Sequence, residues 1–100
     1  MSAAVYQNLQ HALALTIEMV EAAMHDNWTL VSELDAQRQR HLQHAHGKFG
    51  AEHYETLRLL QAHNGTLLER AAQVRAVVEQ QLNQHQYNHR ALQTYITSAR

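Results

Sequence analysis

Apolar residues recur every three or four positions along most of the chain, which is the period of an amphipathic α-helix. The first such segment covers residues 4–24, where two apolar stripes run side by side. One stripe contains Tyr6, Leu9, Leu13, Ile17, Val20 and Met24, and the other contains Ala12, Leu15, Met19 and Ala22. An apolar face this wide predicts a helix that is covered on two sides.

A short polar stretch separates this segment from a second one. The tripeptide HDN at residues 25–27 ends the first helix, and Asp26 or Asn27 can accept a hydrogen bond from the next helix. The second helix is expected at residues 28–46, with inward positions at Leu30, Val31, Leu34, Arg38, Leu42 and Ala45. Because the link is so short, the two helices are predicted to form an antiparallel hairpin.

Two residues of the second helix need their own interpretation. Trp28, the only tryptophan, is expected to pack against Val20 and Met24 in the last turn of the first helix. Arg38 lies among the inward positions and could bind an anion. Such an arginine more often lays its stem on the core and pairs with a carboxylate, and Asp35 or a glutamate of the first helix is available. We favour the ion pair.

The sequence GKFG predicts the end of the second helix, with left-handed backbone at Gly47 and Gly50. A third helix is then expected at residues 51–97. Its apolar seam contains Leu57, Leu60, Asn64, Leu67, Ala71, Val74, Val78, Leu82, His85, His89, Leu92 and Ile96. The stretch NGTLLE, at residues 64–69, has the turn and capping signals of a new helix. Because the seam crosses it in phase, we predict one continuous helix.

Helix lengths indicate where a partner would bind. At 1.5 Å per residue, the first two helices are ~30 Å long and the third is ~70 Å long. The hairpin is therefore expected to cover about half of the third helix and to leave the other half open to a partner. The expected partner-binding residues, which we call the C-terminal seam, are Val74, Val78, Leu82, His85, His89, Leu92, Tyr95 and Ile96. Tyr87 is a further contact candidate.

Composition narrows the classes of function. The 100 residues are expected to form one all-α domain over residues 1–100. A net charge of −1 gives no basic footprint for nucleic acid or anionic lipid, and no apolar run is long enough for membrane insertion. The absence of cysteine and of a signal-peptide pattern suits the cytoplasm. No nucleophile or phosphate-loop motif is present, so we expect neither an enzyme nor a cofactor.

The nine histidines raise a metal hypothesis. His85 and His89 are one helical turn apart, a spacing that can chelate zinc or copper, and His41, His44 and His46 form a second cluster. No third ligand for the pair can be named. The favoured interpretation places these histidines on the surface or inside a partner interface, and no metal site is predicted.

Three stretches carry a resemblance over nearly the whole chain: DNWTLVSELDAQRQRHL, LRLLQAHNGTLLERAAQVR and RALQTY. In order and spacing they resemble the FliT-type flagellar export chaperones, which are short all-α bacterial proteins. The resemblance implies a cytoplasmic chaperone that binds the filament cap protein, prevents its premature assembly and delivers it to the type III export apparatus. It also implies, for some members, restraint of a flagellar transcription regulator.

One feature of some family members is not expected in this chain. Some members carry a further C-terminal helix that folds back over the third, whereas this chain ends at Arg100. We therefore expect the seam to be constantly open, or covered in a homodimer. Two alternatives to the chaperone stay open: a self-associating coiled-coil structural or adaptor protein, and a histidine-rich metal-binding helical bundle.

Overall fold

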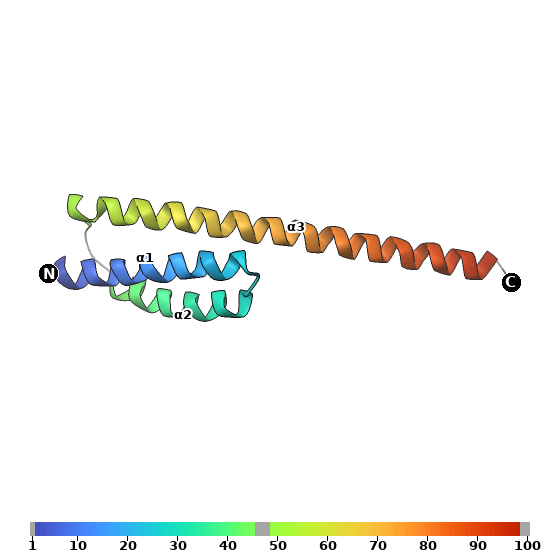
Figure 1. The fold of residues 1–100 in the computed structure, drawn as a ribbon, viewed down its shortest axis with the longest axis horizontal. Coiled ribbons are helices and arrows are strands. Elements are labelled where there is room, and N and C mark those ends of the chain that lie inside the picture. Colours follow the sequence, from blue (N-terminus) through green and yellow to red (C-terminus); the bar gives the residue numbers. More distant parts are fainter. Residues whose placement is uncertain (1, 46–48, 99–100) are drawn as a thin grey trace. The chain divides into compact units, whose positions relative to one another are not determined.

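The computed structural model describes residues 2–45 and 49–98. All regular secondary structure in these residues is helical, which confirms the predicted all-α class. The elements are α1 (Ser2–Met24), α2 (Trp28–His44), the 3-10 turn η1 (Ala51–His53) and α3 (Tyr54–Ser98) (Figure 1). Residues up to Arg70 form one compact unit and residues from Ala71 form a second. The expectation of a single domain over residues 1–100 stays a prediction.

Asp26 and Asn27, in the three-residue turn between α1 and α2, have different roles. Asn27 is the N-cap of α2, and its Oδ1 accepts a hydrogen bond from the backbone N–H of Leu30 at 3.3 Å. Asp26 instead adopts a left-handed backbone with φ of 57°, a conformation that aspartate tolerates better than most residues. The predicted capping is therefore confirmed at Asn27.

The end of α2 differs from its prediction. The helix ends at His44, and the backbone N–H of its C-cap residue, Ala45, bonds to the carbonyl oxygen of Leu42 at 3.1 Å. Gly50 has φ −96° and ψ −175°, which is extended backbone, so the predicted left-handed conformation is wrong there. Gly47 lies outside the described residues.

The buried face of α1 lies between the two predicted stripes. Its members recur at helical spacing and are Leu9, Ala12, Leu13, Thr16, Met19, Ala22 and Ala23. Tyr6, Ile17 and Met24 of the first stripe are 46, 46 and 48% exposed, so their predicted burial is wrong. The reason is the rotation of α1, which packs the boundary of the two stripes against the other helices and leaves one margin in solvent.

The core is centred on Met19, Ala23, Leu34 and Leu67, which come from all three long helices. Leu15, Val20, Trp28 and Val31 pack against this cluster. Trp28 is therefore a packing residue of the hairpin, as predicted, and its Nε1 is buried without a hydrogen-bond partner in the described structure. Because Leu67 belongs to α3, the same cluster holds the first part of α3 on the hairpin.

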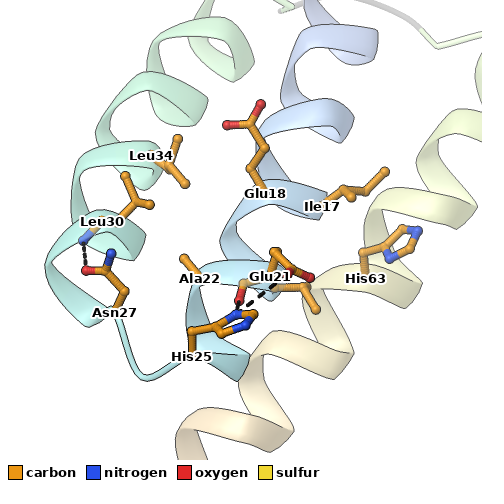
Figure 2. Close-up of a pocket in the computed structure, with 10 residues that line it drawn as sticks. Ile17, Glu18, Glu21, Ala22, His25, Asn27, Leu30, Leu34 and His63 are labelled. Carbon is orange, nitrogen blue, oxygen red and sulfur yellow. Dashed lines mark hydrogen bonds and ion pairs between the residues drawn. The ribbon is translucent and has the colours of Figure 1, made fainter.

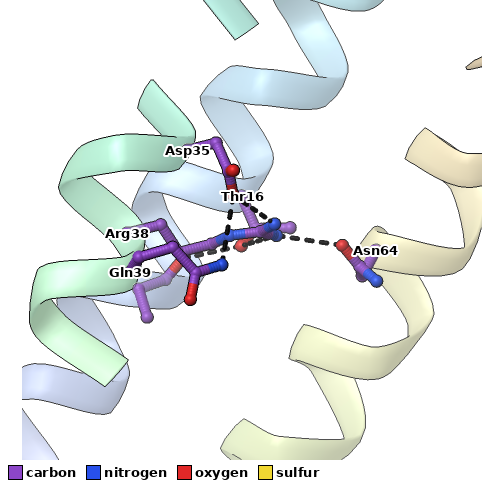
Figure 3. A network of polar contacts seen from close by, with 6 residues as sticks. Thr16, Asp35, Arg38, Gln39 and Asn64 are labelled. Atoms are coloured by element: carbon purple, nitrogen blue, oxygen red, sulfur yellow. Dashed lines mark hydrogen bonds and ion pairs between the residues drawn. The ribbon is translucent and has the colours of Figure 1, made fainter. Parts of the chain in front are cut away.

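Arg38 connects three helices inside this unit (Figure 3). Its Nη1 donates to Asn64 Oδ1 of α3 at 2.9 Å and to Thr16 Oγ1 of α1 at 3.3 Å. Its Nη2 pairs with Asp35 Oδ1 at 2.8 Å, and the arginine side chain is only 13% exposed. The carboxylate pairing predicted for Arg38 is confirmed. Thr16 and Asn64 are additional acceptors, which the sequence pattern did not identify.

A second arginine, Arg70 of α3, bonds to the turn between α1 and α2. Arg70 Nε donates to the backbone carbonyl oxygen of Ala23 at 3.2 Å, and its Nη2 pairs with Asp26 Oδ1 at 2.8 Å. Ala23 lies in the last turn of α1, where carbonyl groups have no partner within the helix. The Ala23 oxygen also accepts a hydrogen bond from the backbone N–H of Asp26 at 3.1 Å, so Arg70 adds a second bond there and ties the turn to α3.

Helix α3 passes through Asn64 and Gly65 without interruption, as the phase of the seam predicted. Thr66 does not cap a new helix, because its hydroxyl donates to the carbonyl oxygen of Ala62 at 3.3 Å, one turn earlier. Two tertiary contacts outweigh the local turn signal. Asn64 accepts a hydrogen bond from Arg38, and Leu67 packs in the core cluster.

Candidate partner-binding surface

The C-terminal seam lies in the second unit, on α3. At 100° per residue, its members other than Tyr95 fall within an arc of about 80° on the helix. Among them Val78, Leu82, Leu92 and Ile96 are 46, 57, 55 and 42% exposed. Val74, at the start, is half-buried, and every residue from Arg75 to Ser98 is exposed. The seam is thus a solvent-exposed stripe in which apolar residues lie on either side of two histidines.

The two tyrosines in this part of α3 lie at different distances from the stripe. Tyr95 is 72% exposed and lies at the margin of the stripe, about 60° from its edge. Val77, which the sequence pattern did not select, is 53% exposed and shares that margin. Tyr87 is 68% exposed but lies on the opposite side of α3, so it cannot contact a partner that covers only the seam.

The polar members of the seam are the two histidines. His85 and His89 border an open depression of about 350 Å³ together with Gln86 and Arg90. The guanidinium beside the imidazoles disfavours a bound metal cation. Within residues 2–45 and 49–98, no group of three or more histidine, cysteine or acidic side chains is placed to hold a metal ion. The metal hypothesis therefore has no third ligand in this part of the chain.

The histidines of α2 bond within the protein. His41 Nδ1 is 2.9 Å from Asn8 Oδ1 of α1. His44 Nδ1 donates to the carbonyl oxygen of Arg40, one turn earlier in the same helix. His46, the third member of the predicted cluster, lies outside the described residues.

Glu55 and Arg58, near the start of α3 and outside the C-terminal seam, have shifted pKa values. Arg58 donates from Nη2 and Nε to the carboxylate of Glu55, at 2.6 and 3.2 Å. These hydrogen bonds lower the pKa of Glu55 and raise the pKa of Arg58. Because both side chains are more than half exposed, the pair contributes little to folding.

A further apolar surface lies on the first unit and was missed by the sequence pattern (Figure 2). It is an open cavity of about 680 Å³ lined by side chains of α1, α2 and α3, which we call the hairpin pocket. Its lining residues are Ile17, Glu18, Val20, Glu21, Ala22, His25, Asn27, Leu30, Leu34 and His63. Ile17 and Leu30 were expected to be buried but are 46 and 37% exposed. Glu18, next to Ile17 in the sequence, and Glu21, one helical turn after Ile17, were the available signal for an open margin.

None of the helices in the described residues combines the length and the apolar character needed to cross a membrane.

Comparison with known proteins supplies the family. A family model described as Flagellar protein FliT matches residues 6–97. The matched residues include Trp28, Arg38, Arg70 and the C-terminal seam. No curated protein and no solved structure matches the chain. Because the family model covers nearly all of the sequence, the chain belongs to the FliT family of flagellar proteins.

Proposed function

We propose that this protein is a cytoplasmic type III export chaperone that binds the flagellar filament cap protein and prevents its premature assembly. Membership of the FliT family implies the role of a flagellar export chaperone. The cap protein as client and the C-terminal seam as its binding surface are the proposal. The observation that supports it is the open apolar stripe on α3.

The free energy for binding comes from covering that stripe. A fully buried aliphatic side chain contributes about 1.5–3 kcal/mol. Val78, Leu82 and Leu92 have roughly half of their surface left to bury. An amphipathic helix of the client, laid along α3, covers all of them at once. His85 and His89 then lie inside the interface, where their ring nitrogens need hydrogen-bond partners from the client.

The proposed partners follow from the same role. The loaded chaperone delivers its client to the export apparatus, and restraint of a flagellar transcription regulator is a second activity proposed from the resemblance. No catalytic step is part of this function. The seam could alternatively pair with the seam of a second copy, because its heptad-like spacing suits a coiled coil. In that case the protein is a self-associating structural or adaptor protein.

The test replaces two neighbouring apolar residues of the seam with glutamate. Val78→Glu with Leu82→Glu should abolish binding of the purified cap protein in calorimetry, because two carboxylates would be buried without partners. Helicity and melting temperature should change little, since both residues are exposed. The control, Gln80→Glu with Asn83→Glu, adds the same charge to the opposite side of α3 and should bind normally.

Two results would contradict the proposal. Full-affinity binding by the Val78→Glu, Leu82→Glu variant would place the client elsewhere. The self-associating alternative would be favoured by a different set of results. The native chain would sediment as a stable dimer, the double variant would be a monomer, and neither would bind the cap protein.

A further inference from the structure

We propose that the hairpin pocket is a second docking site, which takes a positively charged amphipathic helix from a protein partner. This goes beyond the proposed function, because the pocket lies on the first unit and contains none of the C-terminal seam. The argument rests on three features of the pocket: its apolar lining, its acidic margin and its helical walls.

The apolar lining is large enough to receive side chains of a partner. Ala22 and Leu34 are 6% exposed each and belong to the packed interior, whereas Ile17 and Leu30 are 46 and 37% exposed and form its open walls. Its volume of about 680 Å³ lies within the range of about 300–1,000 Å³ that is usual for binding pockets. An aliphatic or aromatic side chain inserted between these walls would cover surface that is now wet.

The margin determines the charge of the occupant. Glu18 and Glu21 line the pocket from α1, and no lysine or arginine is among its described lining residues. His25 Nδ1 donates to the backbone carbonyl oxygen of Glu21 at 3.0 Å and lies 3.6 Å from its Oε1. Because the Glu21 side chain is 75% exposed, its carboxylate stays accessible. The margin thus attracts lysine or arginine and repels anionic peptides and anionic lipid.

The walls determine the shape of the occupant. The walls of the pocket are helical: Ile17 and Glu21 are one turn apart on α1, and Leu30 and Leu34 are one turn apart on α2. A partner helix offers matching anchors at every third or fourth residue. Addition of an extended strand would need a sheet edge, and the described residues form only helices.

The probe is a helical peptide of about 15 residues made of leucine and lysine, compared with a second peptide that has glutamate in place of every lysine. Binding is measured by calorimetry and mapped by amide chemical shifts of the isotope-labelled full chain. A Val78→Gln, Leu82→Gln chain serves as background, because it removes apolar contacts of the seam without adding a charge that would attract or repel either peptide. We expect the lysine peptide to bind this background and shift residues around Ile17, Leu30 and His63, and the glutamate peptide not to bind.

Variants separate the two contributions. Glu18→Gln with Glu21→Gln should weaken binding about fivefold and reduce its dependence on salt. Ile17→Ser should weaken it about tenfold. Glu33→Gln removes an exposed carboxylate of α2 outside the pocket and should leave binding unchanged. Circular dichroism checks that each variant is folded.

Three outcomes would overturn the docking site: equal binding of both peptides, shifts confined to residues 71–98, or unchanged affinity in the folded Ile17→Ser and double-glutamine variants. None of them bears on the cap protein, whose binding is tested separately on the seam.

Discussion

Arg38 of α2 donates a hydrogen bond to the side-chain oxygen of Asn64 in α3, at 2.9 Å. The bond explains why an asparagine lies between Leu60 and Leu67 on the apolar side of α3. Arg38 is largely buried, so its guanidinium needs acceptors from its neighbours. Asp35, Thr16 and Asn64 supply one acceptor each, from three different helices.

Replacing this acceptor should be costly. Asn64→Leu should lower the free energy of unfolding by about 1–3 kcal/mol, because it leaves a buried guanidinium hydrogen without a partner. Asn64→Asp keeps the acceptor and adds a charge opposite to that of Arg38, so it should cost less. Urea denaturation of both variants gives the comparison. An Asn64→Leu variant as stable as the native chain would show that solvent replaces the bond.

The neighbouring glycine makes the opposite prediction. A Cβ added at Gly65 would meet no atom within 4 Å in the described structure, so alanine fits without strain. Gly65→Ala should therefore raise the free energy of unfolding by about 0.5–1 kcal/mol, because glycine loses more backbone entropy in a helix. A loss of stability in thermal denaturation would instead indicate that α3 bends at this residue in solution.

Trp28 can be tested with a pair of substitutions. Trp28→Ala should destabilise the protein by about 2–4 kcal/mol, because the ring packs against the core cluster and is only partly buried. Trp28→Phe should cost clearly less, since the indole Nε1 has no hydrogen-bond partner to lose among the described residues. If both variants lost equal stability in chemical denaturation, an unrecognised bond of Nε1 would be the cause.

The left-handed turn residue offers a matched comparison. Asp26→Ala and Asp26→Gly both remove the 2.8 Å ion pair with Arg70. Only glycine adopts φ of 57° without a steric penalty, so Asp26→Ala should be less stable than Asp26→Gly by about 1 kcal/mol. Equal melting temperatures would mean that the turn rearranges when the ion pair is lost.

The number and type of helices could be predicted from the sequence alone. The apolar period, the polar turn before Trp28 and the scarcity of glycine all favour the same three helices. These signals are local, so they do not depend on how the helices pack. The apolar phase of α3 also predicted its continuity through Asn64 and Gly65, where the local signals pointed to a break. A seam tens of residues long carries more information than a single turn signal.

Only the tertiary structure decided how these helices are rotated and joined. The apolar arc of α1 is wider than its contact surface, so several rotations satisfy the sequence pattern. The observed one buries Thr16 and exposes Ile17, which creates the wall of the hairpin pocket. The bonds of Arg38 to Asn64 and of Arg70 to Ala23 join residues far apart in the chain. Their geometry depends on the packing of α3 against the hairpin, which no local pattern encodes.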